Sequence, residues 1–241
     1  MESKMYQVST LQALALGYTK PVIKVEDLLM HGNTGLGTFE DVNGEMIVVD
    51  GHCYRASETG AVSEVPLYTG VPFASVASIS GGRTKAIEAM DDIDKLKEFL
   101  DLTIEEIFAL NSMHMVRIDG EFTRIKARSE EPYRSHHVTL KDILDKTQRD
   151  FEFTDTKGTL VCVYYPDFMD GINAPGWHLH YLSEDRREGG HVFGIDMKSG
   201  TATFMRLTSI EIKLPDEPAF DTYSLRSASM GDIKKVEQGQ D

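Results

Sequence analysis

Apolar residues recur at helical spacing in five segments of the chain. Thr10 stands before LQALALGY as a cap residue, and Gly32 ends KVEDLLMHG as a helix-stopping residue. Thr103 and Glu106 have the spacing of a capping box, which predicts that a helix begins there. The predicted helices are 11–18, 24–32, 84–102, 104–113 and 139–151.

Strand signals fill the rest of the chain. Residues 45–57 predict two short strands around Asp50-Gly51, and residues 113–129 predict a hairpin around Asp119-Gly120, a dipeptide typical of tight type I′ turns. Further strands are predicted at 71–80, 159–166 and 201–214. Helices and strands interleave without regular βαβ spacing, which favours antiparallel pairing over a doubly wound parallel sheet.

These patterns predict an α/β fold of the α+β type. We expect mixed, largely antiparallel β-sheets in two tightly packed lobes with flanking helices. The length of 241 residues is enough to bury a substantial core, and no repeat or low-complexity linker divides the chain. We therefore expect one domain over residues 1–241.

The glycines of GNTGLGTF, residues 32–39, match neither a dinucleotide-binding loop nor a P-loop. Their expected role is a sharp turn or a close approach to another strand. Cys53 and Cys162 stand in apolar strand-like runs without a C-x-x-C partner, so both are interpreted as buried free thiols.

A net charge of −14 disfavours binding to nucleic acid or to anionic membranes. No window approaches the roughly 18 apolar residues that would span a bilayer. The first twenty residues have no apolar run followed by a small-residue cleavage site. We therefore expect a cytoplasmic protein with neither a nucleic-acid nor a membrane partner.

Three histidines gather in GWHLHYLSEDRREGGHVFG, residues 176–194. His178 and His180 are two residues apart on a predicted strand, so both imidazoles share one face. A hairpin centred between Asp185 and Arg186 places His191 opposite His180. Three neutral nitrogen ligands favour zinc, or another divalent first-row metal, over calcium or magnesium, and three protein ligands favour an open, catalytic site. The alternative is that these are ordinary strand and turn residues.

The sequence resembles the α-acetolactate decarboxylases over essentially its whole length. The residues that carry the resemblance are YQVSTLQAL near the start, HGNTGLGTFEDVNGEMIVVDGHCY at 31–54, VPFASV at 71–76, GWHLHYLSEDRREGGHVFGID at 176–196, and DIKKVE near the end. The resemblance implies zinc-dependent decarboxylation of 2-acetolactate to acetoin and CO₂, in acetoin and 2,3-butanediol biosynthesis. It also implies a homodimer.

The resemblance assigns roles to seven residues of this chain. Three histidines bind the zinc ion in the family, and they match His178, His180 and His191. The other family site residues match Thr38, Glu45, Arg128 and Glu237. Arg124 and Lys126 share the predicted strand face of Arg128 and are its competitors for the arginine role.

The implied chemistry is the loss of CO₂ through an enediolate that the metal stabilises. Arg128 would bind the substrate carboxylate, and Glu45 would deliver the proton, with Glu237 as the second candidate. Two other functions compete with this interpretation. A cupin-like metal-dependent dioxygenase or isomerase would use a glutamate after the H-x-H pair, here Glu184, and a non-catalytic metal-binding module would need no proton donor.

Overall fold

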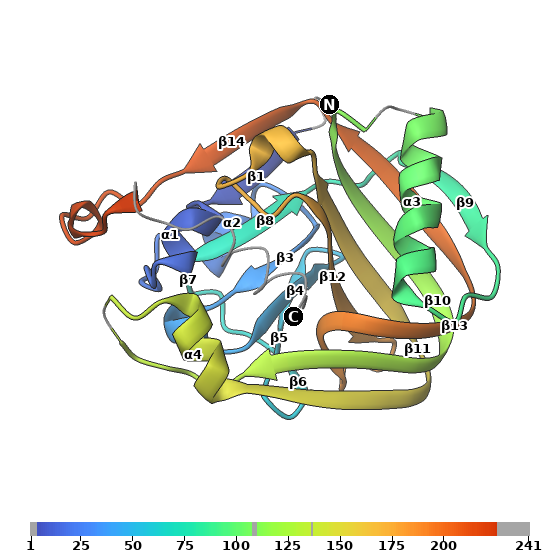
Figure 1. Cartoon of the computed structure of the whole chain (residues 1–241), viewed down its shortest axis with the longest axis horizontal. Helices are drawn as coiled ribbons and strands as arrows, with labels where there is room; N and C mark the ends of the chain where they lie inside the picture. The colour runs from blue at the N-terminus through green and yellow to red at the C-terminus, as the bar shows by residue number, and fades with distance from the viewer. Residues whose placement is uncertain (1–3, 108–109, 136, 226–241) are drawn as a thin grey trace.

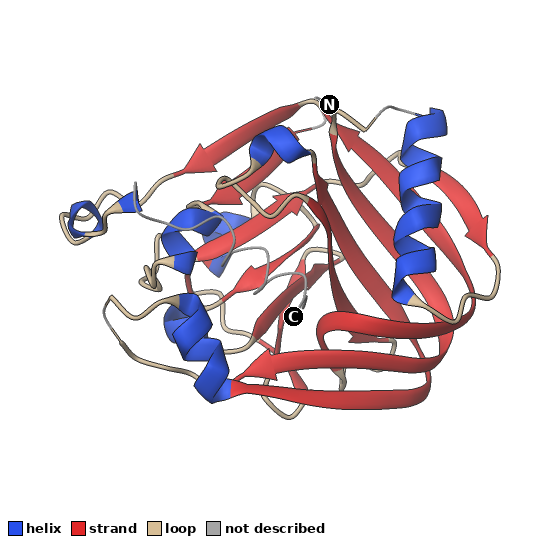
Figure 2. Cartoon of the chain, in the orientation of Figure 1, coloured by secondary structure: helices blue, strands red, loops and turns tan. Residues whose placement is uncertain are grey.

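The computed structural model describes residues 4–107, 110–135 and 137–225, and it contains two β-sheets packed face to face (Figure 1). Figure 2 shows that strands make up most of the body and that the helices lie around them. The expected α+β fold with largely antiparallel sheets in two packed lobes is confirmed.

The first sheet has seven strands and carries the glycine-rich segment. Its order is β14 (Ser209–Lys213), β1 (Lys4–Val8), β8 (Phe73–Ala77), β3 (Thr34–Thr38), β4 (Glu45–Val49), β5 (His52–Ala56) and β6 (Val62–Glu64). Only β1 and β14 pair in parallel among these strands. β2 (Ile23–Lys24) and β7 (Gly70–Val71) form a separate small pair.

Two local predictions in this sheet are confirmed. Asp50 and Gly51 form the turn between β4 and β5, both with positive φ. Gly35 and Gly37 lie so close to β8 that a Cβ atom would approach the carbonyl oxygens of Ser75 and Phe73 to 2.2 and 2.3 Å. The glycine-rich segment is therefore a strand that depends on close backbone approach.

The second sheet closes on itself. Its order is β10 (Met113–Glu130), β11 (Gln148–Tyr165), β12 (Gly176–Ser183), β13 (Gly189–Leu207) and β9 (Arg83–Ile87), and β10 also pairs with β13. Figure 1 shows that β10, β11 and β13 each bend near the middle. Gly120 lies in register with Gly158 on one side and with Gly200 on the other, so three glycines form one row across these strands.

The predicted hairpin around Asp119-Gly120 is wrong. Residues 113–130 form one continuous strand, β10, and neither Asp119 nor Gly120 has the positive φ of a type I′ turn. Asp119 instead accepts hydrogen bonds from Arg117 and from Thr159. The local turn preference is overridden because β10 has a pairing partner along both of its edges.

The helices begin where cap residues predict, with one exception. The Thr10 and Thr139 hydroxyls accept from backbone N–H groups of the first turns of α1 and α4. The short segments labelled η are 3₁₀ turns. The helical elements are α1 (Leu11–Ala15), α2 (Val25–Leu29), α3 (Ile93–Ile107), α4 (Leu140–Thr147), η1 (Glu40–Val42), η2 (Asp167–Met169) and η3 (Phe220–Thr222).

The exception is the capping box at Thr103, and the helix predicted at 84–102 also begins too early. Residues Arg83–Ile87 form β9, which pairs with β13. Thr103 lies inside α3 and donates its hydroxyl to the Phe99 carbonyl, 2.7 Å away. A continuous buried stripe through Leu96, Leu100 and Ile104 holds residues 93–107 as one helix, so tertiary packing overrides the local signal.

Strict alternation along two strands determines what lies between the sheets. Along β4, Ile47 and Val49 belong to the cluster between the sheets, whereas Met46 and Val48 face α2 on the outer side. Along β12, Leu182 belongs to the cluster between the sheets. The period of two residues therefore turns Glu45 toward the second sheet, and His178 and His180 toward the first.

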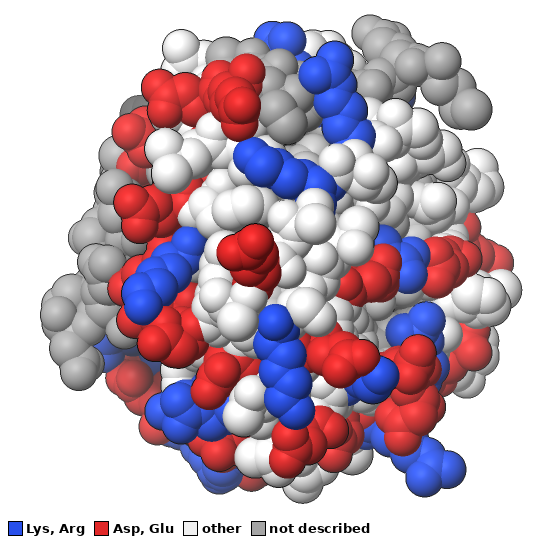
Figure 3. Space-filling model, turned by 90° about the vertical axis from the view of Figure 1, so that its right-hand side faces the viewer, with Lys and Arg blue, Asp and Glu red and all other residues white. Residues whose placement is uncertain are grey.

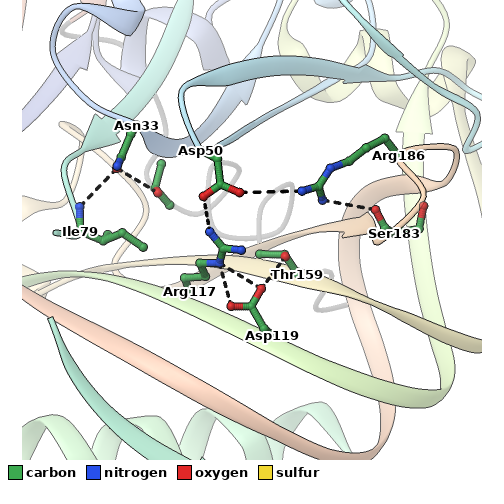
Figure 4. A network of polar contacts seen from close by, with 9 residues as sticks. Asn33, Asp50, Ile79, Arg117, Asp119, Thr159, Ser183 and Arg186 are labelled. Carbon is green, nitrogen blue, oxygen red and sulfur yellow. Dashed lines mark hydrogen bonds and ion pairs between the residues drawn. The ribbon is translucent and has the colours of Figure 1, made fainter. Parts of the chain in front are cut away.

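A polar network also joins the two sheets away from this cluster (Figure 4). Arg117 of β10 donates to Asp50 in the β4–β5 turn. Arg186, in the turn between β12 and β13, lies 3.8 Å from the other oxygen of Asp50. Each such half-exposed pair contributes little alone, but together they link both hairpin turns to β10.

The glycine row predicts a specific sensitivity. A Cβ atom at position 158 would lie 2.3 Å from the Leu182 carbonyl oxygen, so Gly158→Ala should destabilise the fold by about 2 kcal/mol through overpacking. Gly194→Ala in β13 is the matched control, because its Cβ atom would meet only the flexible side chain of Lys126. Urea unfolding measures both, and equal stability of the two variants would contradict the close approach.

Candidate metal centre

Three imidazoles meet between the two sheets, as the strand-face argument predicted. His180 and His191 are directly paired across the β12–β13 hairpin. The Nε2 atom of His178 lies 3.0 Å from Nε2 of His180 and 3.0 Å from Nδ1 of His191. Nitrogens bound to one tetrahedral zinc ion lie about 3.3 Å apart, so the cluster is close to a ligand arrangement.

A hydrogen bond on the side of the His180 ring away from the other two imidazoles fixes its orientation. Its Nδ1–H donates to the Met46 carbonyl of β4 at 2.8 Å, which leaves the lone pair of Nε2 directed at the other two rings. Metal-binding histidines commonly have such a partner on the second ring nitrogen. The Met46 carbonyl was missed in the sequence, because backbone groups leave no signal there.

Burial keeps these imidazoles neutral. It lowers the pKa of His178 to about 3, and the charges of Arg128 and Lys97 act in the same direction. Burial also lowers the pKa of His180 and His191 well below 6.5. Neutral imidazoles have the lone pairs that a divalent metal requires, so the three residues fit a metal ion. Among the described residues, they are the one group with metal-ligand geometry.

Glu45 faces the same cluster from the first sheet. Its Oε2 atom lies 3.3 Å from Nε2 of His180, and its Oε1 atom lies 3.9 Å from Nδ1 of His191. Ser129 of β10 fixes the backbone there, because its hydroxyl accepts from the Glu45 N–H and donates to the Ala56 carbonyl. Sequence reasoning found Glu45 and missed Ser129.

Arg128 lies at the edge of the cluster, and neither Arg124 nor Lys126 lines the same pocket. Arg128 is in register with His191, and its Nη2 atom lies 3.3 Å from Nε2 of that ring. When Nδ1 of His191 binds a metal, Nε2 carries the proton. The contact between this ring and the guanidinium is then packing, because both groups are donors.

Thr38 also lines the pocket, where it supports the turn before Glu45. It pairs with Glu45 across β3 and β4, and its hydroxyl donates to the Gly44 carbonyl at 3.0 Å. Two further positions mark the limits of the site. Glu237 lies outside the described residues, and Glu184 is an exposed turn residue that the pocket does not include.

One pocket is lined by Thr38, Glu45, Arg128, His178 and His191, and its empty volume with its open mouth is about 460 Å³. Besides the expected residues it includes Glu130 and Gln148, which are in register across β10 and β11. Glu130 is two residues from Arg128, a spacing that could have pointed to it. The apolar lining residues are Leu14, Val42, Phe73, Leu140 and Leu144.

Comparison with known proteins decides the family. The family model described as alpha-acetolactate decarboxylase matches residues 5–227. The alpha-acetolactate decarboxylase of Methanosarcina mazei is 36% identical over 97% of this chain and 80% of its own length. That of Klebsiella aerogenes is 32% identical over 98% of this chain and 90% of its own length.

The chain belongs to the alpha-acetolactate decarboxylase family. The crystal structure of the enzyme from Bacillus subtilis strain 168 superposes with a TM-score of 0.91 at 29% identity, covering 98% of this chain and 99% of that one. The resemblance drawn from the sequence motifs is therefore confirmed, and so is the expectation of an acetolactate decarboxylase enzyme. The family assignment takes the place of the interpretation as a cupin-like dioxygenase or isomerase.

The charged side chains of the surface, the helices and the two cysteines can be compared with the sequence-based expectations. On the face in Figure 3, acidic and basic side chains are interspersed without a continuous basic area. No helix in the described part of the chain is long and apolar enough to cross a membrane. Cys53 and Cys162 are buried free thiols, as predicted, and burial raises the pKa of the Cys53 thiol to about 12.

Removing one imidazole should abolish tight metal binding. His180→Ala deletes the ring that links the cluster to Met46, so we expect metal affinity to fall by more than about 100-fold. His52→Ala is the control, because His52 is an exposed strand residue that pairs with Glu64. Metal per chain after dialysis measures the difference, and full metal content in His180→Ala would contradict the site.

Proposed function

We propose that the chain converts 2-acetolactate to acetoin and CO₂ with a zinc ion held by His178, His180 and His191. The observation that carries the proposal is the convergence of three neutral imidazoles beside Glu45 and Arg128, at a pocket that His178 and His191 line. When bound, zinc supplies a positive charge that stabilises the enediolate oxygens as a Lewis acid. The other tasks fall to side chains of this chain.

Arg128 binds the substrate carboxylate in this proposal. A guanidinium matches a planar carboxylate with two parallel N–H donors, and its pKa is too high for it to act as an acid. The register pairing with His191 supports the role, because it holds the guanidinium at the edge of the metal cluster. Arg128 would thereby hold the bond to the departing CO₂ out of the plane of the ketone, where it overlaps the carbonyl π-system.

Glu45 delivers the proton to the carbon that has lost CO₂. That carbon becomes a stereocentre in acetoin, so the proton must arrive on one face. Its carboxyl group, which acts as the donor in its protonated form, lies beside the imidazole nitrogens and is mostly shielded from water, with 14% of its side chain exposed. Ser129 and Thr38 support this role, because both fix the backbone around Glu45.

Glu237 is the second candidate for the proton donor. Leu225 is held against α1, because its carbonyl accepts a hydrogen bond from the Gln12 side chain, and Leu14 of the same helix lines the pocket. The twelve residues 226–237 can span up to about 40 Å, a length that supports a return of Glu237 to the site.

Four broader properties complete the proposal. We infer one domain over residues 1–241, because the pocket draws its lining from both sheets and a single sheet would leave the site incomplete. A zinc cofactor, a cytoplasmic location and a homodimer remain expectations that come from the family resemblance and the composition.

Replacing the proposed acid should separate catalysis from metal binding. Glu45→Gln keeps the size of the side chain but cannot donate the same proton, so we expect kcat for CO₂ release to fall at least about 100-fold with metal content unchanged. Glu64→Gln, a surface carboxylate, is the control. Loss of the metal would make Glu45 a ligand instead, and retention of both metal and turnover would pass the donor role to Glu237.

A further inference from the structure

The pocket has an apolar side that the proposed decarboxylation does not use. We call it the apolar wall, formed by Leu14, Val42, Phe73, Leu140 and Leu144. These residues belong to a hydrophobic cluster of their own, distinct from the cluster between the two sheets. A pocket that only had to hold a metal and a carboxylate would not need this wall.

One stripe of α4 connects the two sides of the pocket. Leu140 and Leu144 lie four residues apart on one face of α4, Gln148 follows four residues later as the first residue of β11, and all three line the pocket. Gln148 is in register with Glu130 of β10, so this end of the stripe meets the polar side. Leu140 and Leu144 then extend the lining along the helix into the apolar wall.

The residues behind the apolar wall are buried and well held, whereas Leu144 in the wall is partly exposed. Ile143 of α4 is fully buried, and the Thr139 hydroxyl caps the helix, so the backbone of α4 is well held. Leu14 comes from α1, which contacts α4, and Figure 1 shows both helices at the same end of the molecule. Leu144 packs against this cluster but is only partly buried, so it is the more accessible residue of the α4 pair.

The chemistry of the substrate class suggests what the wall receives. A 2-hydroxy-3-oxo acid has a carboxylate, a hydroxyl and a ketone, which suit Arg128 and the metal cluster. What remains are its alkyl groups, and these gain free energy by leaving water for an apolar surface. The polar groups would be fixed at one side of the pocket, so the alkyl groups would point toward the other.

We propose that the apolar wall receives the alkyl groups of the substrate and that Leu144 sets the longest group accepted. This inference rests on the proposed function. A shorter side chain at position 144 makes room for at least one additional methylene, and a larger one removes it. One methylene in an apolar pocket changes relative rates by about tenfold or more.

The test compares 2-acetolactate with its homologue that carries ethyl in place of methyl on the tetrahedral carbon. The readout is the ratio of kcat/KM for the ethyl and methyl compounds, measured on the zinc-loaded full chain. Leu144→Ala should raise the ratio about tenfold, and Leu144→Phe should lower it about tenfold. Leu29→Ala, a partly buried leucine on the short helix α2, is the matched control and should leave the ratio unchanged.

The outcomes distinguish the inference from the function beneath it. A ratio that stays within about twofold in both Leu144 variants would overturn the role of the wall. An equal loss with both substrates would do the same, because it would indicate a purely structural role. A wild-type chain that releases CO₂ from neither compound would overturn the proposed function, and the inference with it.

Discussion

One buried hydrogen bond joins the two halves of the site. The Nδ1–H group of His180, on the second sheet, donates to the Met46 carbonyl, on the first. Neither partner has access to water at this depth, so its loss would leave a buried donor and a buried carbonyl unsatisfied. The bond also holds the Nε2 lone pair toward the other rings and places Glu45, the residue before Met46, beside them.

The position of the His180 ring also depends on the register of β12 with its neighbouring strands. On β12, Trp177, Leu179 and Tyr181 fill the core of the closed sheet, while His178 and His180 point to the other face. A slip by one residue would turn the imidazoles into that apolar core and the aromatic rings into the space between the two sheets. The apolar residues that stabilise the fold therefore also determine where the three imidazoles point, and the histidine cluster follows from the packing of the two sheets.

Local signals predicted part of this arrangement correctly. The position of the 185–186 turn fixed the pairing of His180 with His191, and Asp50-Gly51 turned as expected. The same reasoning failed at Asp119-Gly120, because pairing along both edges of β10 outweighs a two-residue turn preference. The apolar wall could not be predicted either, since Leu14 and Leu144 meet only through tertiary contacts of two short helices.

The central claim is that three imidazoles hold one zinc ion. X-ray absorption spectroscopy of the metal-loaded protein at the zinc edge tests it most directly. We predict a first shell of nitrogen and oxygen atoms at about 2.0–2.1 Å, with the outer-shell scattering of three imidazole rings. A shell containing sulfur, or scattering from a single imidazole, would contradict the assignment of His178, His180 and His191 as the ligands.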